Sequence, residues 1–300
     1  FLREARVQAQ ISHQNVVTVH NILELKSGNP CIVMEYVDGT SLKELTSRGA
    51  IYGLAECAKM FAKISRGLHA AHALGIVHRD IKPANILVDQ SGEPLISDFG
   101  LAKRTQHDRT LTMTGQIMGT MEYMSPEQAR HSAGADERSD IFSLGASFFA
   151  TLTGRSILGS GLSATEALLF ITEADMAAES ITLLKELRPD ISGGLQARLF
   201  TLVGKLLAYQ PEDRTQSAQE VASMFDEIAE QAENHVDELP PKLIAIDGPG
   251  NNAETTDSPP PESEDSGTDA ISAPGNDQET TDLPPRAFEA TRSRTVVGLS

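Results

Sequence analysis

The order of apolar patterns along the 300 residues predicts an α+β fold, with a few strands first and many helices after them. Hydrophobic residues make up 40% of the chain, which is enough to build a core. A change of composition after residue 232 then sets an acidic tail apart from this folded region. We therefore expect one folded region followed by a tail.

The first part of the folded region combines one helix-like run with several strand-like runs. Residues 1–13 contain no Gly or Pro, and the spacing of their apolar residues suggests a helix. Short apolar runs predict strands at 16–19, 22–25 and 31–37, with a turn at 27–30 before the last of them.

Helices dominate the rest of the folded region. The pattern from Leu54 to Leu74 is helical, and Gly75 stands where a helix C-cap is expected. Two short strand-like runs follow, at 86–88 and 95–97, and a turn joins them. Further helical patterns cover residues 139–153, 163–172, 195–208 and 216–233.

The tail is acidic and repetitive. Residues 236–300 hold 13 acidic and 4 basic side chains, a net charge of −9 out of −17 for the whole chain. Pro, Gly, Ser and Thr are frequent there, so the tail buries too little apolar surface to offset the entropy of ordering. A Pro-Gly-Asn, Glu-Thr-Thr-Asp, Pro-Pro pattern occurs twice, at 249–260 and 274–285. We interpret residues 233–300 as disordered, with the repeat as a duplicated linker or a partner-docking motif.

Composition also excludes several classes of protein. The acidic balance disfavours a general nucleic-acid-binding protein, because phosphate contacts need clustered Lys and Arg. Cys31 and Cys57 are too few for a disulfide scaffold or a cysteine-based zinc site, so a cytoplasmic setting is expected. No apolar run approaches the roughly 18 residues of a membrane helix. We expect no membrane segment within this sequence; an anchor beyond Ser300 is left open.

One short stretch carries most of the chemical information. Residues 78–85 read His-Arg-Asp-Ile-Lys-Pro-Ala-Asn, Asp-Phe-Gly follows at 98–100, and Ser-Pro-Glu at 125–127. In this order and spacing the motifs resemble those of the eukaryotic-like protein kinases, and most of all their bacterial serine/threonine branch. The resemblance covers about residues 1–230 and implies a protein-kinase-like fold.

The resemblance divides the chain into three parts. Residues 1–37 would form a partial N-lobe that begins at the kinase C helix, residues 38–232 a complete and mainly helical C-lobe, and residues 233–300 the tail. Kinases carry a glycine-rich loop and an ATP-binding lysine before the C helix, and neither is in this sequence. We therefore expect an N-terminally truncated fragment of an active kinase, itself inactive.

The resemblance also implies a role for each residue of the central motifs. Phosphoryl transfer depends on positioning and charge neutralisation more than on covalent catalysis. Asp80 would accept the proton of the attacking hydroxyl, and Lys82 would lie near the γ-phosphate. Asn85 and Asp98 would hold Mg²⁺ or Mn²⁺, which prefer oxygen ligands. The implied reaction moves the ATP γ-phosphate to Ser or Thr hydroxyls of proteins, the kinase itself included.

The ATP site is expected around the segment that resembles the kinase hinge. Glu4 lies in the run that resembles the C helix and would pair with the ATP-binding lysine. Met34 falls at the gatekeeper position, and the backbone from Glu35 to Val37 would bind adenine. Leu87 would lie beneath the adenine ring. For Met34 and Leu87, plain core packing is the alternative interpretation.

Several polar residues are expected to support the site. Glu127 should pair with Arg214, because a deeply buried charge needs a partner. Asp140 should accept hydrogen bonds from the backbone of the catalytic loop. His69 and His72 are one helical turn apart, a spacing that can bind metal, but no third ligand is near them in the sequence. We expect these two histidines to pack in the fold.

Three other functions are weighed against this one. A pseudokinase or scaffold is expected to lack Asp80, Asn85 or Asp98, and all three are present. A small-molecule phosphotransferase of the same superfamily is disfavoured by the Gly-Thr pair in which Thr120 would seat the substrate Ser or Thr. An interaction protein that acts through its acidic tail would lose its partners when residues 236–300 are deleted.

The loop between the Asp-Phe-Gly and Ser-Pro-Glu motifs predicts control by phosphorylation. It carries Thr112 and Thr114, and a phosphothreonine has about −1.5 to −2 charges that pair well with Arg. Arg79 and Lys103 would form the phosphate pocket. We expect autophosphorylation at Thr112, Thr114 or both, detected by mass spectrometry of active protein. Finding both threonines always unmodified would contradict this prediction; the alternative is a simple Thr-rich loop.

Overall fold

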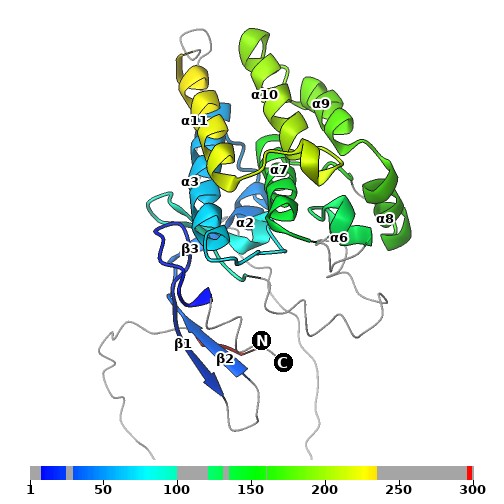
Figure 1. Cartoon of the computed structure of the whole chain (residues 1–300). Coiled ribbons are helices and arrows are strands. Elements are labelled where there is room, and N and C mark those ends of the chain that lie inside the picture. The colour runs from blue at the N-terminus through cyan, green and yellow to red at the C-terminus, as the bar shows by residue number, and fades with distance from the viewer. Residues whose placement is uncertain are drawn as a thin grey trace, which may run out of the picture. The chain divides into compact units, whose positions relative to one another are not determined.

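The computed structural model describes residues 8–24, 30–99, 121–130, 135–159, 161–234 and 296–298. In this part of the chain the strands form two small sheets, and helices dominate from Leu54 onward (Figure 1). The predicted α+β fold class is therefore confirmed.

The first sheet precedes the helices. Strand β1 (Val19–Glu24) pairs antiparallel with β2 (Pro30–Met34), with Ile22 opposite Ile32. The other edge of β2 pairs antiparallel with β6 (Val296–Gly298), a strand from the tail that the sequence pattern does not predict. β-Branched residues favour extended backbone, which is consistent with a strand at this Val-Val pair.

The prediction of separate strands at 16–19 and 22–25 is wrong, because the chain makes one strand from Val19. Val16 and Val17 are both buried and lie beside the second sheet. The Val17 backbone N–H donates to the carbonyl of Ile96 at 2.9 Å. The apolar pair thus joins the segment before β1 to the second sheet.

The second sheet has the strand order β3 (Gly39–Ser41), β4 (Ile86–Asp89) and β5 (Pro94–Ile96). β4 and β5 lie where the sequence predicts strands, whereas β3 is too short to give an alternating pattern. At Gly39 a Cβ atom would lie only 2.3 Å from the carbonyl oxygen of Val88. Glycine is therefore required there for β3 to approach β4.

The helical patterns predicted from the sequence correspond to α3, α7, α8, α10 and α11. Three further helices, α2, α6 and α9, were not predicted; the first two are too short to show helical periodicity. Among the described helices, none combines the length and apolar character of a membrane span. The helices are α2 (Leu42–Ser47), α3 (Leu54–His72), α6 (Pro126–Arg130), α7 (Glu137–Thr153), α8 (Ala164–Glu173), α9 (Met176–Leu187), α10 (Gly193–Leu206) and α11 (Ala218–Asn234), with 3₁₀ turns η1 (Pro83–Asn85) and η3 (Pro211–Asp213).

Local sequence signals account for where several helices begin and end. Gly75 has φ 71°, a left-handed conformation that suits glycine, just after α3 ends. Gly154 has the same φ and caps α7. At the start of α8, Ser163 and Glu166 form a capping box, each side chain bonded to the other residue's backbone N–H.

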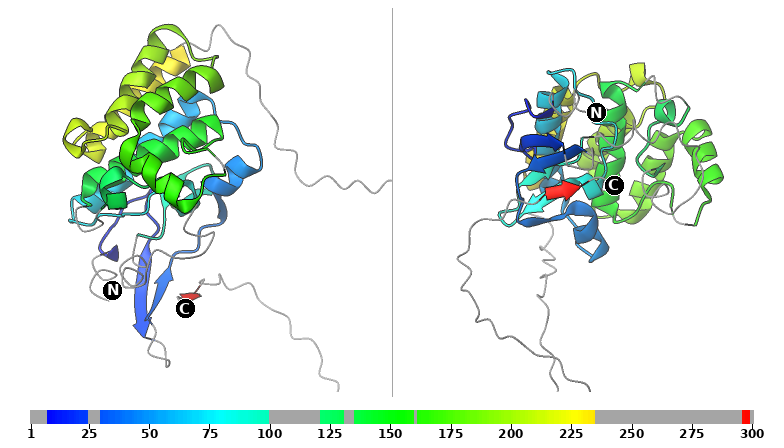
Figure 2. Two further views of the ribbon diagram at one scale, coloured as in Figure 1. Left: turned by 90° about the vertical axis from the view of Figure 1, so that its right-hand side faces the viewer. Right: turned by 90° about the horizontal axis from the view of Figure 1, so that it is seen from below.

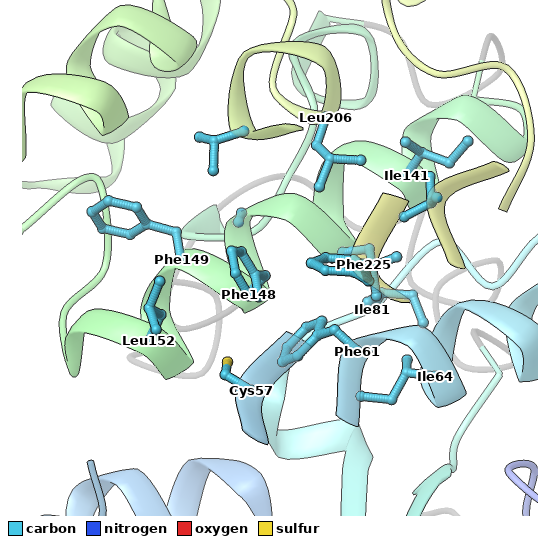
Figure 3. Packing of buried hydrophobic residues seen from close by; sticks show 14 of the residues in the cluster. Cys57, Phe61, Ile64, Ile81, Ile141, Phe148, Phe149, Leu152, Leu206 and Phe225 are labelled. Carbon is cyan, nitrogen blue, oxygen red and sulfur yellow. The ribbon is translucent and has the colours of Figure 1, made fainter. Parts of the chain in front are cut away.

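Helix α7 forms the centre of the core. All residues from 139 to 152 are buried, and α3 lies alongside both α7 and α11 (Figures 1 and 2). Phe61 of α3, Phe148 of α7 and Phe225 of α11 meet where the three helices pack together (Figure 3). The ring centroids of Phe61 and Phe148 are 5.3 Å apart at 76°, and those of Phe148 and Phe225 are 4.8 Å apart. Such pairs stabilise the packing beyond the area that they bury.

Replacing Phe61 by alanine should destabilise the fold strongly. The ring is fully buried against two other aromatic rings, so its loss leaves a cavity between three helices. We expect the free energy of unfolding to fall by about 3–5 kcal/mol, measured by urea denaturation. Leu169→Ala is the control, because that side chain on α8 is 54% exposed and should change stability by no more than about 0.5 kcal/mol.

Candidate active site

Three polar side chains converge in the loop between α3 and β4. The Nζ of Lys82 lies 2.8 Å from Oδ2 of Asp80. Asn85, at the end of η1, donates from Nδ2 to the backbone carbonyl of Asp80 at 2.8 Å and to its Oδ2 at 3.2 Å. The Asp80 side chain is 17% exposed, so the loop presents a carboxylate that is fixed from two sides and still accessible.

Asp98 is joined to this loop through the residue before it. Ser97 donates from its backbone N–H to the carbonyl of Asn85 at 2.9 Å. The Ser97 hydroxyl lies 3.2 Å from both that carbonyl and Oδ2 of Asp98. Asp98 itself is exposed and has φ 55°, a left-handed conformation that is uncommon for a residue with a side chain. The end of β5 thus presents a second carboxylate next to the catalytic loop.

The donor set fits a divalent cation bound together with a polyphosphate. Asn85 uses Nδ2 for its hydrogen bonds to Asp80, which leaves the amide oxygen Oδ1 as its ligand atom. An amide oxygen and the Asp98 carboxylate are ligands of the kind Mg²⁺ accepts, with water and phosphate completing the shell. Within the described residues, no group of three His, Cys, Asp or Glu is arranged to hold a metal.

Asp140 anchors the backbone of the catalytic loop. Its side chain, in the first turn of α7, has no exposed surface. Oδ2 accepts from the backbone N–H of His78 and Oδ1 from that of Arg79, each at 2.7 Å. Arg79 has φ 66°, a conformation that costs a non-glycine residue about 1–3 kcal/mol. The two charge-assisted bonds from Asp140 stabilise it.

His72 is a site residue that sequence reasoning missed. Its Nε2 lies 2.9 Å from Oδ2 of Asp140, and its side chain is only 5% exposed. It is packed, as expected, but it also gives the buried carboxylate a third partner. The one signal in the sequence is its position in the last turn of the helix that leads to the catalytic loop.

His78 connects the catalytic loop to the strand that precedes Asp98. Its Nδ1 accepts from the backbone N–H of Asp80 at 3.2 Å, and its Nε2 lies 3.0 Å from the carbonyl of Ser97. Nε2 therefore carries the hydrogen. Burial lowers the pKa of His78, although the nearby carboxylates alone would raise it. The lowered pKa is consistent with a neutral ring. The ring also packs on Phe99, with centroids 4.5 Å apart.

The segment that resembles the kinase hinge runs directly from one sheet to the other. Met34 ends β2 and is partly buried, Glu35 is exposed, and Val37 is of intermediate exposure. β3 then begins, and its register places Ser41 opposite Leu87 of β4. The structure therefore places Leu87 on the strand next to the one that follows the hinge.

Glu127 and Arg214 form a bidentate ion pair. Nη1 of Arg214 lies 2.7 Å from Oε1 of Glu127, and Nη2 lies 2.8 Å from Oε2. The Ser139 hydroxyl donates to the same Oε1 at 2.6 Å. The Arg214 side chain is fully buried, 5.0 Å above the ring of Phe142. Its remaining donors bond to the backbone carbonyls of Arg138, Ala208 and Tyr209.

Some of the expected site residues lie outside the described residues. They are Glu4, Lys103, Thr112, Thr114 and Thr120. The C-helix ion pair, the phosphorylation sites, the Lys103 half of the phosphate pocket and the substrate-seating threonine therefore stay predictions.

Comparison with known proteins decides the family. The sequence profile described as "Protein kinase domain" matches residues 1–225. This chain belongs to the protein kinase family. The kinase-like fold that its motifs imply is thereby confirmed.

Similar proteins include bacterial serine/threonine kinases. The probable serine/threonine-protein kinase PknB of Corynebacterium glutamicum is 33% identical over 240 residues, covering 78% of this chain and 36% of that protein. The probable PknB of Lactococcus lactis is 41% identical over 155 residues, 52% of this chain and 24% of that protein. PknB of Mycobacterium leprae is 32% identical over 226 residues, covering 74% of this chain and 34% of that protein. The chain thus spans about a third or less of the length of these relatives. Their similarity confirms the resemblance to the bacterial serine/threonine branch.

Removing the charge of Glu127 should destabilise this kinase fold. Glu127→Gln leaves the guanidinium of Arg214 buried without its counter-charge. We expect the free energy of unfolding at pH 7 to fall by about 3–5 kcal/mol. Urea denaturation measures the loss, and Glu137→Gln, at an exposed glutamate in the first turn of α7, is the control that should change stability by no more than about 1 kcal/mol.

The same pair should make stability depend on pH. Burial alone would raise the pKa of Glu127, but the hydrogen bonds and charge of Arg214 lower it from 4.5 to about 2. Because the pKa of Glu127 is lower in the folded chain than in the unfolded chain, the ionised pair stabilises the fold above pH 4.5. This contribution is lost as the pH falls from about 4.5 to 2. Glu127→Gln should therefore show a shallower fall of Tm over this range than the unaltered chain.

Proposed function

We propose that this chain supplies the catalytic machinery of a serine/threonine protein kinase, which transfers the γ-phosphate of ATP to Ser or Thr hydroxyls of proteins. One observation supports this most directly. Lys82 and Asn85 converge on the carboxylate of Asp80, and Ser97 ties Asn85 to Asp98. Family membership alone gives a fold, whereas this cluster gives a nucleophile-orienting carboxylate beside a cation and two candidate metal ligands.

Asp80 orients the substrate and takes its proton. Its carboxylate accepts the hydrogen bond of the substrate hydroxyl, whose oxygen attacks the γ-phosphorus of ATP. The bond from that phosphorus to the bridging oxygen breaks, ADP leaves with the electron pair, and the hydroxyl proton passes to Asp80. The ammonium of Lys82, 2.8 Å from Oδ2, lies close enough to offset negative charge on the transferred phosphoryl group.

Asn85 and Asp98 would hold the metal, and the segment that resembles the kinase hinge would bind the adenine of ATP. A divalent cation held by these two residues, Mg²⁺ or Mn²⁺, would neutralise negative charge on the ATP phosphates. Asn85 contributes Oδ1, and Asp98 its exposed carboxylate. The backbone between Glu35 and Val37 binds adenine, with Leu87 beneath the ring. Glu4 would pair with the ATP-binding lysine that kinases carry before the C helix.

Control and location complete the proposal. The enzyme acts in the cytoplasm on protein substrates and on itself, with Thr112 and Thr114 as the sites of autophosphorylation. Arg79 and Lys103 bind the resulting phosphate, and Thr120 seats the substrate hydroxyl. The chain divides into a partial N-lobe at 1–37, a C-lobe at 38–232 and an acidic tail at 233–300, with disorder between the end of α11 and β6. No observation favours the alternative, a pseudokinase scaffold.

Substituting Asp80 tests the proposed reaction. Asp80→Asn keeps the size of the side chain and removes the proton acceptor. We expect phosphate transfer from ATP to casein, measured with the natural protein that also carries the glycine-rich loop and ATP-binding lysine, to fall about 10²–10⁴-fold, with ATP binding retained. Asp226→Asn is the control, since this exposed carboxylate on α11 pairs with Arg66 on α3. Full activity of Asp80→Asn, or ATP binding without any transfer by the unaltered protein, would count against a kinase.

A further inference from the structure

One side chain connects the Ser-Pro-Glu motif to the catalytic loop. Gln128 lies on α6, directly after the Glu127 that pairs with Arg214. Its Nε2 donates to the backbone carbonyl of Arg79, 49 residues away in the sequence, at 3.0 Å. Its Oε1 accepts from both the backbone N–H and the hydroxyl of Ser125, each at 3.1 Å. The carboxamide therefore uses both of its ends.

The carbonyl that Gln128 binds belongs to the peptide unit that carries Asp80. A peptide unit is planar, so its C=O and N–H groups cannot turn independently. Gln128 holds the C=O of the Arg79–Asp80 unit, and Nδ1 of His78 accepts from its N–H at 3.2 Å. The Arg79 N–H on the preceding unit is bound by Asp140. Gln128 is thus the contact that fixes this peptide from the side of α6.

Only a carboxamide of this length meets both requirements. Gln presents a donor and an acceptor at the end of a three-bond side chain, whereas an ionised Glu of the same size offers acceptors alone. Glu would set a carboxylate oxygen against the carbonyl of Arg79 and keep the contacts with Ser125. Ser125 is fully buried, so the Oε1 end of the amide is held in a fixed place.

We propose that Gln128 is a positioning residue for Asp80. It orients the Arg79–Asp80 peptide, and it makes that orientation depend on the Ser-Pro-Glu motif being seated on the core through Glu127 and Arg214. This inference rests on the proposed role of Asp80 and adds a link between that residue and the Ser-Pro-Glu motif at 125–127. The class of reaction is unchanged by it.

Hydrogen exchange tests the link without requiring activity. In the full chain, Gln128→Glu should raise the exchange rate of backbone amides in residues 78–83 several-fold. The matched control is Gln196→Glu. Gln196 lies in α10, and its Nε2 also donates to a backbone carbonyl, that of Ile191, at 2.8 Å. Gln128→Met, similar in size and unable to make either bond, replaces Gln128→Glu if that variant does not fold. Exchange in 78–83 equal to that of the control would overturn the inference.

Phosphotransfer kinetics of the natural protein, with its glycine-rich loop and ATP-binding lysine, separate positioning from stability. Gln128→Glu should lower kcat about 10- to 100-fold while the KM for ATP changes less than twofold, because the variant misplaces Asp80 and leaves the nucleotide contacts intact. Gln196→Glu should change neither constant. An unaltered kcat for Gln128→Glu overturns the proposal. If the unaltered protein transfers no phosphate, the proposed function fails, and hydrogen exchange still decides whether Gln128 fixes the loop.

Discussion

The catalytic loop depends on one carboxylate that is entirely removed from water. Burying an ionised Asp140 costs several kcal/mol unless its oxygens are satisfied. Here they bond to the backbone N–H groups of His78 and Arg79 and to the ring of His72. Asp140 also lies in the first turn of α7, where the positive end of the helix dipole favours a negative charge. The core helix thereby determines the conformation of the loop that carries Asp80.

A second anchor lies in a helix of five residues. On α6, Glu127 bonds to the buried Arg214, and the next side chain, Gln128, bonds to the carbonyl of Arg79. Adjacent residues of a helix point in different directions, so one short helix can contact two partners. The Ser-Pro-Glu motif and the catalytic loop therefore share their support, although Gln128 and Arg79 are 49 residues apart in the sequence.

The sequence is most informative where residue types are tied to chemistry or to a long period. Helices such as α3 and α11 show apolar residues at helical spacing, and the clustered motifs alone single out Asp80, Asn85 and Asp98 as candidates. His72 was missed because its partner, Asp140, is 68 residues away and a lone histidine on a helix has many uses. The Val16–Val17 pair was misread, because strand periodicity cannot show which sheet an apolar pair will contact.

The pairing of α3 with α11 has a consequence for synthesis of the chain. Arg66 and Asp226 join these two helices and are 160 residues apart. A ribosome that adds 5–20 residues per second leaves roughly 8 to 32 s between them. Throughout that interval Phe61 and its apolar neighbours on α3 lack the α11 surface that later covers them. The nascent chain therefore exposes the apolar surface of α3 until α11 has been synthesised. Binding by a chaperone would be most useful during that interval.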